Sequence, residues 1–192
     1  MNKLLVDIHT HRPTDALTIR TVGLHPWHAD QKLPSEADYK TADAIGEIGL
    51  DKACKMAFKQ QQAAFIEQLD LAERLHKAVV IHCVRAFEEV MQSLRHRTLR
   101  AVIFHGFIGS PKQAARAIER GYYLSFGTRS SRSSKTIEAL RLTPPERLFV
   151  ETDDDPTPIE EVYAVIASLR EVSVEELQRT THENYLRLFQ KQ

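Results

Sequence analysis

The sequence has few cysteines, no long apolar stretch and no excess of charge of either sign. Its two cysteines, Cys54 and Cys83, form no C-x-x-C pair and exclude a disulfide framework. The apolar run near the N-terminus is interrupted by Asp7 and is too short for a signal peptide, and no later run could span a membrane. We therefore expect a reduced, cytoplasmic setting.

The charge and the length restrict the protein class further. Lysine and arginine together equal aspartate and glutamate, at 26 each, so there is no global field that attracts nucleic acid. A local basic patch could still bind it. A chain of 192 residues without repeats or linkers is expected to form one domain, 1–192, with a full core.

Short apolar runs alternate with longer amphipathic stretches. Helical periodicity covers residues 59–77, 86–95, 110–121, 158–170 and 174–189. The alternation predicts a parallel α/β fold, for which a closed (β/α) barrel and an open doubly wound sheet both fit. The strand-like runs are KLLVDI, TIRTVGL, DAIGEIGL, AVVIHCV, AVIFHGF, YYLSFG and RLFVET.

Potential metal ligands stand at the ends of these runs. In VDIHTH, alternate side chains of an extended strand share a face, so both imidazoles of H-x-H can reach one ion. The carboxyl ends of parallel strands form the rim where active sites lie in such folds. The candidates at this rim are His9, His11, Glu47, His82, His105 and Asp153.

Each of these residues taken alone also has an ordinary structural explanation. A single histidine at a strand end is usually a hydrogen-bonded structural residue, and Glu47 or Asp153 could cap a helix. Six potential ligands at equivalent ends of five runs are hard to explain in that way. Burying so many titratable groups without a cation would also be unfavourable. The joint pattern therefore predicts a metal site.

The motifs D-I-H-T-H, G-L-H-P-W, G-E-I-G-L-D, V-I-H, H-G-F-I-G-S and E-T-D occur in this order over almost the whole chain. In this combination the sequence resembles the TatD-type metal-dependent hydrolases. The resemblance implies an amidohydrolase-like (β/α) TIM-type barrel. Only HRPTDAL joins the first two runs, where family members commonly carry a βα unit. We therefore expect about seven strands, with one βα unit missing after the first strand.

The resemblance also implies two divalent cations, for which the mixed nitrogen and oxygen ligands suit zinc, manganese or magnesium. His9, His11 and Asp153 would hold one ion. His82 and His105 would hold the other, and Glu47 would bridge them. Such a pair of ions generates a nucleophilic hydroxide near neutral pH.

Further roles follow from the same resemblance. Asp153 would act as general base, and with Glu47 and His25 it forms the expected catalytic set. His25 would lie near the substrate, although it could be a loop histidine fixed by its proline neighbour. Asp7 and Asp51 would orient histidines or backbone, and Asp51 could equally cap a helix.

The sequence departs from the family at three places near the substrate. An arginine typically stands two residues after the fourth-strand histidine, but here Val84 has that position and the arginine is Arg85. Two extra carboxylates, Asp154 and Asp155, follow the E-T-D motif. The Arg-Asn stretch often found beyond that motif is missing. Substrate contacts of full-length members therefore do not transfer directly.

A basic segment, residues 127–135, follows the run YYLSFG, and it could bind phosphates or be a solvated loop. The leading prediction is phosphodiester hydrolysis on DNA. The alternatives are amide or ester hydrolysis of a small or aminoacyl-linked substrate, and a non-catalytic metal-binding module. No membrane and no obligate protein partner is expected. The possible substrate contacts are Arg85, Arg129, Arg132 and Lys135.

Overall fold

The computed structural model describes residues 5–190, which fall into two compact units. Unit 1 combines the N-terminal segment up to Ile19 with the chain from His105 onward, and unit 2 is the stretch Arg20–Phe104 between them. The single-domain prediction therefore stays a prediction. Within the described range, no helix is long and apolar enough to cross a membrane.

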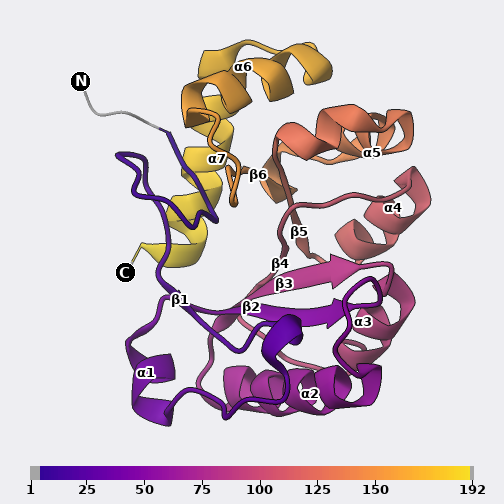
Figure 1. The fold of residues 1–192 in the computed structure, drawn as a ribbon. Coiled ribbons are helices and arrows are strands. Elements are labelled where there is room, and N and C mark those ends of the chain that lie inside the picture. Colours follow the sequence, from indigo (N-terminus) through magenta and orange to yellow (C-terminus); the bar gives the residue numbers. More distant parts are fainter. Residues whose placement is uncertain (1–4, 191–192) are drawn as a thin grey trace. The chain divides into compact units, whose positions relative to one another are not determined.

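Unit 2 contains four parallel strands that pair in chain order (Figure 1). The strands are β1 (Thr21–Val22), β2 (Ala44–Asp51), β3 (Ala78–Val84) and β4 (Val102–Phe104). The connections between them carry a 3-10 helix and three α-helices, namely η1 (Pro26–His28), α1 (Glu36–Thr41), α2 (Phe58–Arg74) and α3 (Phe87–Ser93).

Strand β2 is the centre of this unit because it pairs on both edges and is buried at every position except Glu47. Its register with β3 shifts between Ile45 and Ile48, where two residues of β2 stand opposite one of β3. Such a bulge redirects a side chain, here that of Glu47. Gly46 is required at this point, since a Cβ atom there would lie 2.6 Å from the Val80 Cβ.

Unit 1 is built around β6 (Leu148–Val150), which pairs in parallel with β5 (Tyr123–Phe126). The N-terminal segment also runs parallel to the β6 region, because Ile8 N donates to Val150 O and Asp153 N donates to His9 O. The helices of this unit are α4 (Pro111–Glu119), η2 (Thr128–Arg132), α5 (Ser134–Leu142), η3 (Pro145–Arg147), α6 (Ile159–Arg170) and α7 (Val174–Phe189).

Buried polar contacts fix the N-terminal segment within unit 1. The Tyr163 hydroxyl, on α6, donates to Val6 O at 2.9 Å and accepts from Val6 N at 3.1 Å. It also shares a 2.7 Å hydrogen bond with Thr181 Oγ1 on α7. Val6 is therefore held by a residue of α6 that lies 157 positions later in the chain and is itself bound to α7.

The predicted elements agree with this fold. Six of the seven expected runs contain strands, and the first contributes an isolated bridge at Val6, with a second bridge at Thr10 just after it. Residues 3 and 4 of that first run lie outside the described residues. Residues 12–18 contain no helix, which confirms the missing helix after the first run. The short α1 and the helix α5 were not predicted as separate elements.

Candidate metal centre

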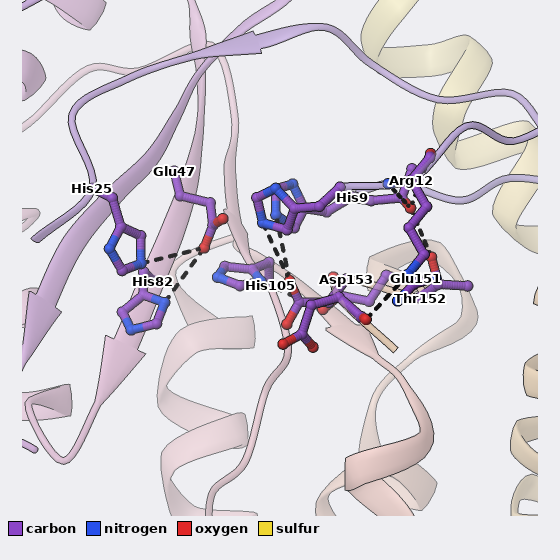
Figure 2. A network of polar contacts seen from close by, with 12 residues as sticks. His9, Arg12, His25, Glu47, His82, His105, Glu151, Thr152 and Asp153 are labelled. Carbon is purple, nitrogen blue, oxygen red and sulfur yellow. Dashed lines mark hydrogen bonds and ion pairs between the residues drawn. The ribbon is translucent and has the colours of Figure 1, made fainter. Parts of the chain in front are cut away.

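In unit 1, two of the predicted histidine ligands lie near one carboxylate oxygen of a third predicted ligand, Asp153 (Figure 2). Asp153 Oδ1 lies 3.8 Å from His9 Nε2 and 3.5 Å from His11 Nε2. The backbone holds this arrangement, since His11 N donates to Asp153 O while Asp153 N donates to His9 O. Asp153 has a left-handed backbone with φ 56°, an uncommon conformation for a non-glycine residue that often marks functional sites.

His105 and Glu151 belong to the same unit and extend this cluster. The His105 ring lies 4.7 Å from the His9 ring, and His105 Nδ1 lies 3.4 Å from Glu151 Oε1. Glu151 is almost completely buried, and its Oε2 has no hydrogen-bond partner within the described residues. Sequence reasoning missed Glu151 as a candidate ligand. The signal was present, because positions 151 and 153 alternate just as positions 9 and 11 do.

Asp7 supports the unit 1 cluster by binding Thr152. Its carboxylate accepts hydrogen bonds from Thr152 N at 2.9 Å and from Thr152 Oγ1 at 2.7 Å. Burial raises the pKa of Asp7 to about 6, although the bonds from Thr152 partly oppose this. Asp7 thus fixes the residue that stands between Glu151 and Asp153. This contact agrees with the predicted backbone-orienting role.

In unit 2, Glu47 lies between two histidines (Figure 2). Its Oε2 is 3.7 Å from His25 Nε2 and 3.4 Å from His82 Nδ1. The His25 and His82 rings are 4.4 Å apart. His25 therefore lies beside a predicted ligand, and its Nδ1 also accepts from Trp27 N at 3.2 Å as the N-cap of η1, so its role near the substrate stays a prediction.

Asp51 orients this second cluster through three neighbours. Its Oδ2 lies 3.3 Å from His82 Nε2 and accepts the Trp27 indole N–H at 2.6 Å, while Oδ1 accepts from Ala53 N at 2.7 Å. Burial alone would raise the pKa of Asp51, but the bonds from Trp27, Ala53 and His82 outweigh it and hold the pKa below its usual value. The predicted orienting role fits this geometry, and Asp51 caps no helix within the described residues.

Two buried glutamines of α2 hold the loops that carry these side chains. Gln61 accepts from Asp51 N at 2.8 Å and donates to Asp51 O at 3.0 Å. Gln68 accepts from Leu24 N at 2.6 Å and donates to Leu24 O at 3.1 Å, directly before His25. One helix thus fixes the ends of both β1 and β2.

The donor sets of both clusters fit a divalent cation. The candidate ligand atoms of His25, Glu47 and His82 lie within 4.8 Å of one another, as do those of His105, Glu151 and Asp153. Imidazole nitrogens with carboxylate oxygens are the ligands that zinc and manganese take in hydrolases. The buried Glu151 oxygen without a hydrogen-bond partner is a further point of fit, because burial of such an oxygen is unfavourable unless a cation compensates it.

The predicted substrate residues differ in their surroundings. Arg85 follows β3 with φ 53° and makes no ion pair within residues 5–190, so its role stays a prediction. The segment 127–135 is no extended loop, because it forms η2 and the first turn of α5. Arg129 pairs with Asp154 at 2.7 Å, whereas Arg132 and Lys135 are exposed.

Comparison with known proteins gives these clusters a context. A family described as "TatD related DNase" matches residues 8–190. The Escherichia coli K12 protein "Uncharacterized metal-dependent hydrolase YjjV" is 31% identical over 194 residues, which cover 88% of this chain and 75% of that protein. The human protein "Deoxyribonuclease TATDN3" is 30% identical over 179 residues, which cover 84% of this chain but only 65%, just under two thirds, of that protein.

The structural comparison agrees at the level of the fold. The crystal structure of YjjV, a TatD homologue from Escherichia coli, matches over 100% of both chains with a TM-score of 0.84 and 24% sequence identity. This match confirms the predicted α/β fold. The family match over residues 8–190 and the 31% identity to YjjV show that the chain is a metal-dependent hydrolase of the TatD-related DNase family.

Proposed function

We propose that the protein hydrolyses phosphodiester bonds of DNA with two divalent cations. The observation that carries this proposal is the presence of two imidazole–carboxylate clusters in one chain of this family, one cluster in each unit. The human relative's name, a deoxyribonuclease, supports DNA as the substrate. Zinc or manganese suits the nitrogen-rich donor sets better than magnesium, which prefers oxygen ligands.

In this proposal the six predicted ligands divide between two ions as the family resemblance implies. His9, His11 and Asp153 would hold one, and the contacts of both histidines with Asp153 Oδ1 support it. The resemblance assigns His82, His105 and Glu47 to the other, and within unit 2 the 3.4 Å contact of His82 Nδ1 with Glu47 Oε2 supports the pairing of those two residues. When bound, the cations would supply Lewis acidity at the phosphoryl oxygens and lower the pKa of a water.

Asp153 has the geometry of a general base for the attacking water. Its side chain is about one fifth exposed, and Arg129 Nη1 lies 3.7 Å from its Oδ2. A carboxylate that is fixed by backbone on both sides and still reaches solvent can take a proton without rearranging. His25, which contacts Glu47 and lies on the loop after β1, is placed to bind a substrate oxygen.

The local charges of unit 1 are compatible with a polyanion. Asp154 is neutralised by Arg129, so this extra carboxylate does not repel phosphate as an isolated charge would. Asp155 accepts hydrogen bonds from Thr128 at 2.6 Å and Thr157 at 2.6 Å, and these lower its pKa to about 2, so this carboxylate stays negatively charged near neutral pH. Two cations, Arg132 and Lys135, remain exposed for phosphate contacts.

The test supplies manganese, zinc or magnesium separately and offers single-stranded DNA, duplex ends, a small phosphodiester, and a set of amides and esters. We expect metal-dependent turnover of the DNA substrates, abolished in Asp153→Asn. Turnover of carbonyl substrates alone, equally abolished by Asp153→Asn, would replace the nuclease by an amide or ester hydrolase that uses the same site. Failure of every substrate with every metal would favour the non-catalytic module.

A further inference from the structure

A cleft of about 580 Å³ opens beside the metal cluster of unit 2. It contains one aromatic ring, one exposed cation, apolar side chains and an amide. Its lining residues are Trp27, Cys54, Lys55, Met56, Ala57 and Gln60. None of these residues is among the predicted metal ligands, and only Trp27 takes part in the site described above, through its hydrogen bond to Asp51.

Trp27 is exposed but fixed in orientation. Its indole N–H donates to Asp51 Oδ2 at 2.6 Å, and its ring meets the His25 ring at an interplanar angle of 86° and a centroid distance of 4.8 Å. The His82 ring is 6.2 Å away. Nevertheless 55% of Trp27 remains exposed. A large ring that is held rigidly without being buried is arranged as a platform for another flat ring.

The charge in the cleft comes from Lys55. The nearby Lys52 is engaged by Glu89 and packs over the Phe58 ring, so its ammonium is already compensated. Lys55 is exposed and makes no ion pair with any residue of the described chain. An ammonium group within the same cleft as a flat aromatic ring matches a nucleotide, which joins a planar base to an anionic phosphate.

We propose that this cleft is a subsite for an unpaired nucleobase that flanks the scissile phosphodiester, with the base stacked on Trp27 and a neighbouring phosphate at Lys55. The inference rests on the proposed function, which supplies the polynucleotide. Stacking needs an open base face, so the cleft favours single-stranded ends over paired duplex. Loss of one stacked base weakens binding on the order of 5- to 100-fold.

The fluorescence of the protein gives a direct test, because Trp27 is the only tryptophan in the chain. The metal-loaded protein is titrated with a deoxyadenosine trimer that carries phosphorothioate linkages, and then with an abasic trimer of the same charge. We expect saturable quenching by the adenosine trimer and affinity at least about 5-fold weaker for the abasic one. Equal binding of both trimers, or no quenching at all, would overturn the subsite.

Variants distinguish a specific contact of Lys55 from a general effect of positive surface charge. Lys55→Ala should weaken binding of the adenosine trimer several-fold and raise KM without a matching fall in kcat. The control is Lys59→Ala, which removes an exposed lysine of α2 that does not line the cleft and should change neither value. Identical effects of Lys55→Ala and Lys59→Ala would overturn the role of Lys55.

Cleavage assays on the same preparation distinguish this inference from the proposed function. DNA cleavage without base-dependent quenching would overturn the subsite and leave the nuclease intact. Base-dependent quenching without cleavage of any DNA substrate would support the nucleobase cleft and overturn the nuclease. In a third measurement, Trp27→Phe should retain most of the preference for a terminal base over an abasic end, since the phenyl ring still stacks, whereas Trp27→Ala should lose it.

Discussion

The two candidate metal clusters are held in place by different means. In unit 2, the loops around His25 and Asp51 are fastened by Gln61 and Gln68, both from helix α2. In unit 1, the cluster depends on backbone hydrogen bonds between His9 and Asp153, two chain segments that lie 144 positions apart. Asp7 and Thr152 fasten the same two segments a second time.

This difference indicates which cluster forms more easily. Contacts of Leu24 and Asp51 with α2 close the shorter loops. Pairing of the N-terminal segment with β6 closes a loop that contains almost the whole chain. Loop closure costs more entropy for longer loops, although the dependence is weak. We therefore expect the unit 2 cluster to be robust. The unit 1 cluster should be more sensitive to changes that loosen the N-terminal segment.

The largest expected effect is on chemistry in unit 1. Asp153→Asn removes the proposed general base and should lower kcat by about 10²- to 10⁴-fold, since an amide does not accept the proton. The matched control is Asp154→Asn, because this carboxylate is adjacent, exposed and paired with Arg129. Steady-state kinetics on a DNA substrate provide the measurement. Equal losses in both variants would contradict a special role of Asp153.

The second effect is on metal content and compares the two clusters directly. Because Glu47 would bridge, Glu47→Ala should lower an initial content of about two ions per chain to well below one. His11→Ala removes a ligand of only one ion and should leave about one. Elemental analysis after incubation with zinc or manganese measures both. If Glu47→Ala kept one ion, Glu47 would serve a single site.

The two predictions above vary Asp153 and Glu47, which could be identified from the sequence. Ligands often stand at the ends of hydrophobic runs, and such ends meet at one edge of a parallel sheet. His105 and Asp153 are of this kind, since they follow β4 and β6, whereas Glu47 and His82 lie inside β2 and β3. The helices at 59–77 and 174–189 could be predicted for a similar reason, since their apolar periodicity extends over several turns.

Other features could not be predicted because they depend on tertiary contacts. Helix α1 has only six residues and a single buried side chain, so it has no periodic pattern to detect. The role of Gln68 depends on the position of Leu24, 44 residues away. The pairing of Arg129 with Asp154 joins two loops, and only their placement shows that the extra carboxylate is neutralised.

The third effect tests the support of the unit 2 cluster. Gln68→Leu leaves Leu24 N, Leu24 O and the Tyr39 hydroxyl without their buried partner. Each unsatisfied buried group costs about 1–3 kcal/mol, so the loss of three partners should lower the free energy of unfolding by roughly 3 kcal/mol or more. Urea denaturation measures it, with the exposed Glu67→Gln as control. A loss below about 0.5 kcal/mol, typical of surface positions, would contradict this support.

The fourth effect tests the support of the unit 1 cluster. Tyr163→Phe removes the hydroxyl that binds Val6 N, Val6 O and Thr181, and should cost about 1–3 kcal/mol of unfolding free energy. The control Tyr185→Phe removes a solvent-exposed bond to Thr18 O and should cost less than about 0.5 kcal/mol. If the unit 1 cluster is the more sensitive one, Tyr163→Phe should also weaken metal binding, whereas Gln68→Leu should not.

The smallest effect concerns the basic residues of unit 1. Arg132 and Lys135 are exposed, whereas Arg129 already pairs with Asp154. Each phosphate contact on a single strand contributes about 0.7 to the slope of log K against log salt, so Arg132→Gln with Lys135→Gln should reduce the slope by about 1.4. Arg129→Gln should change the slope less, because Asp154 already compensates the charge of Arg129 in the free protein.

The measurement of this last comparison is fluorescence anisotropy of a labelled single strand, titrated at several potassium chloride concentrations. Lys112→Gln, an exposed lysine on α4, corrects for the general loss of positive charge. Suppose that Lys112→Gln and the double variant reduce the slope of log K against log salt by the same amount per charge removed. That result would indicate that residues 127–135 make no specific phosphate contact. If Arg129→Gln reduced the salt slope more than the double variant does, Arg129 would contact a phosphate in the complex. The DNA phosphate would then replace the Asp154 carboxylate as the partner of Arg129.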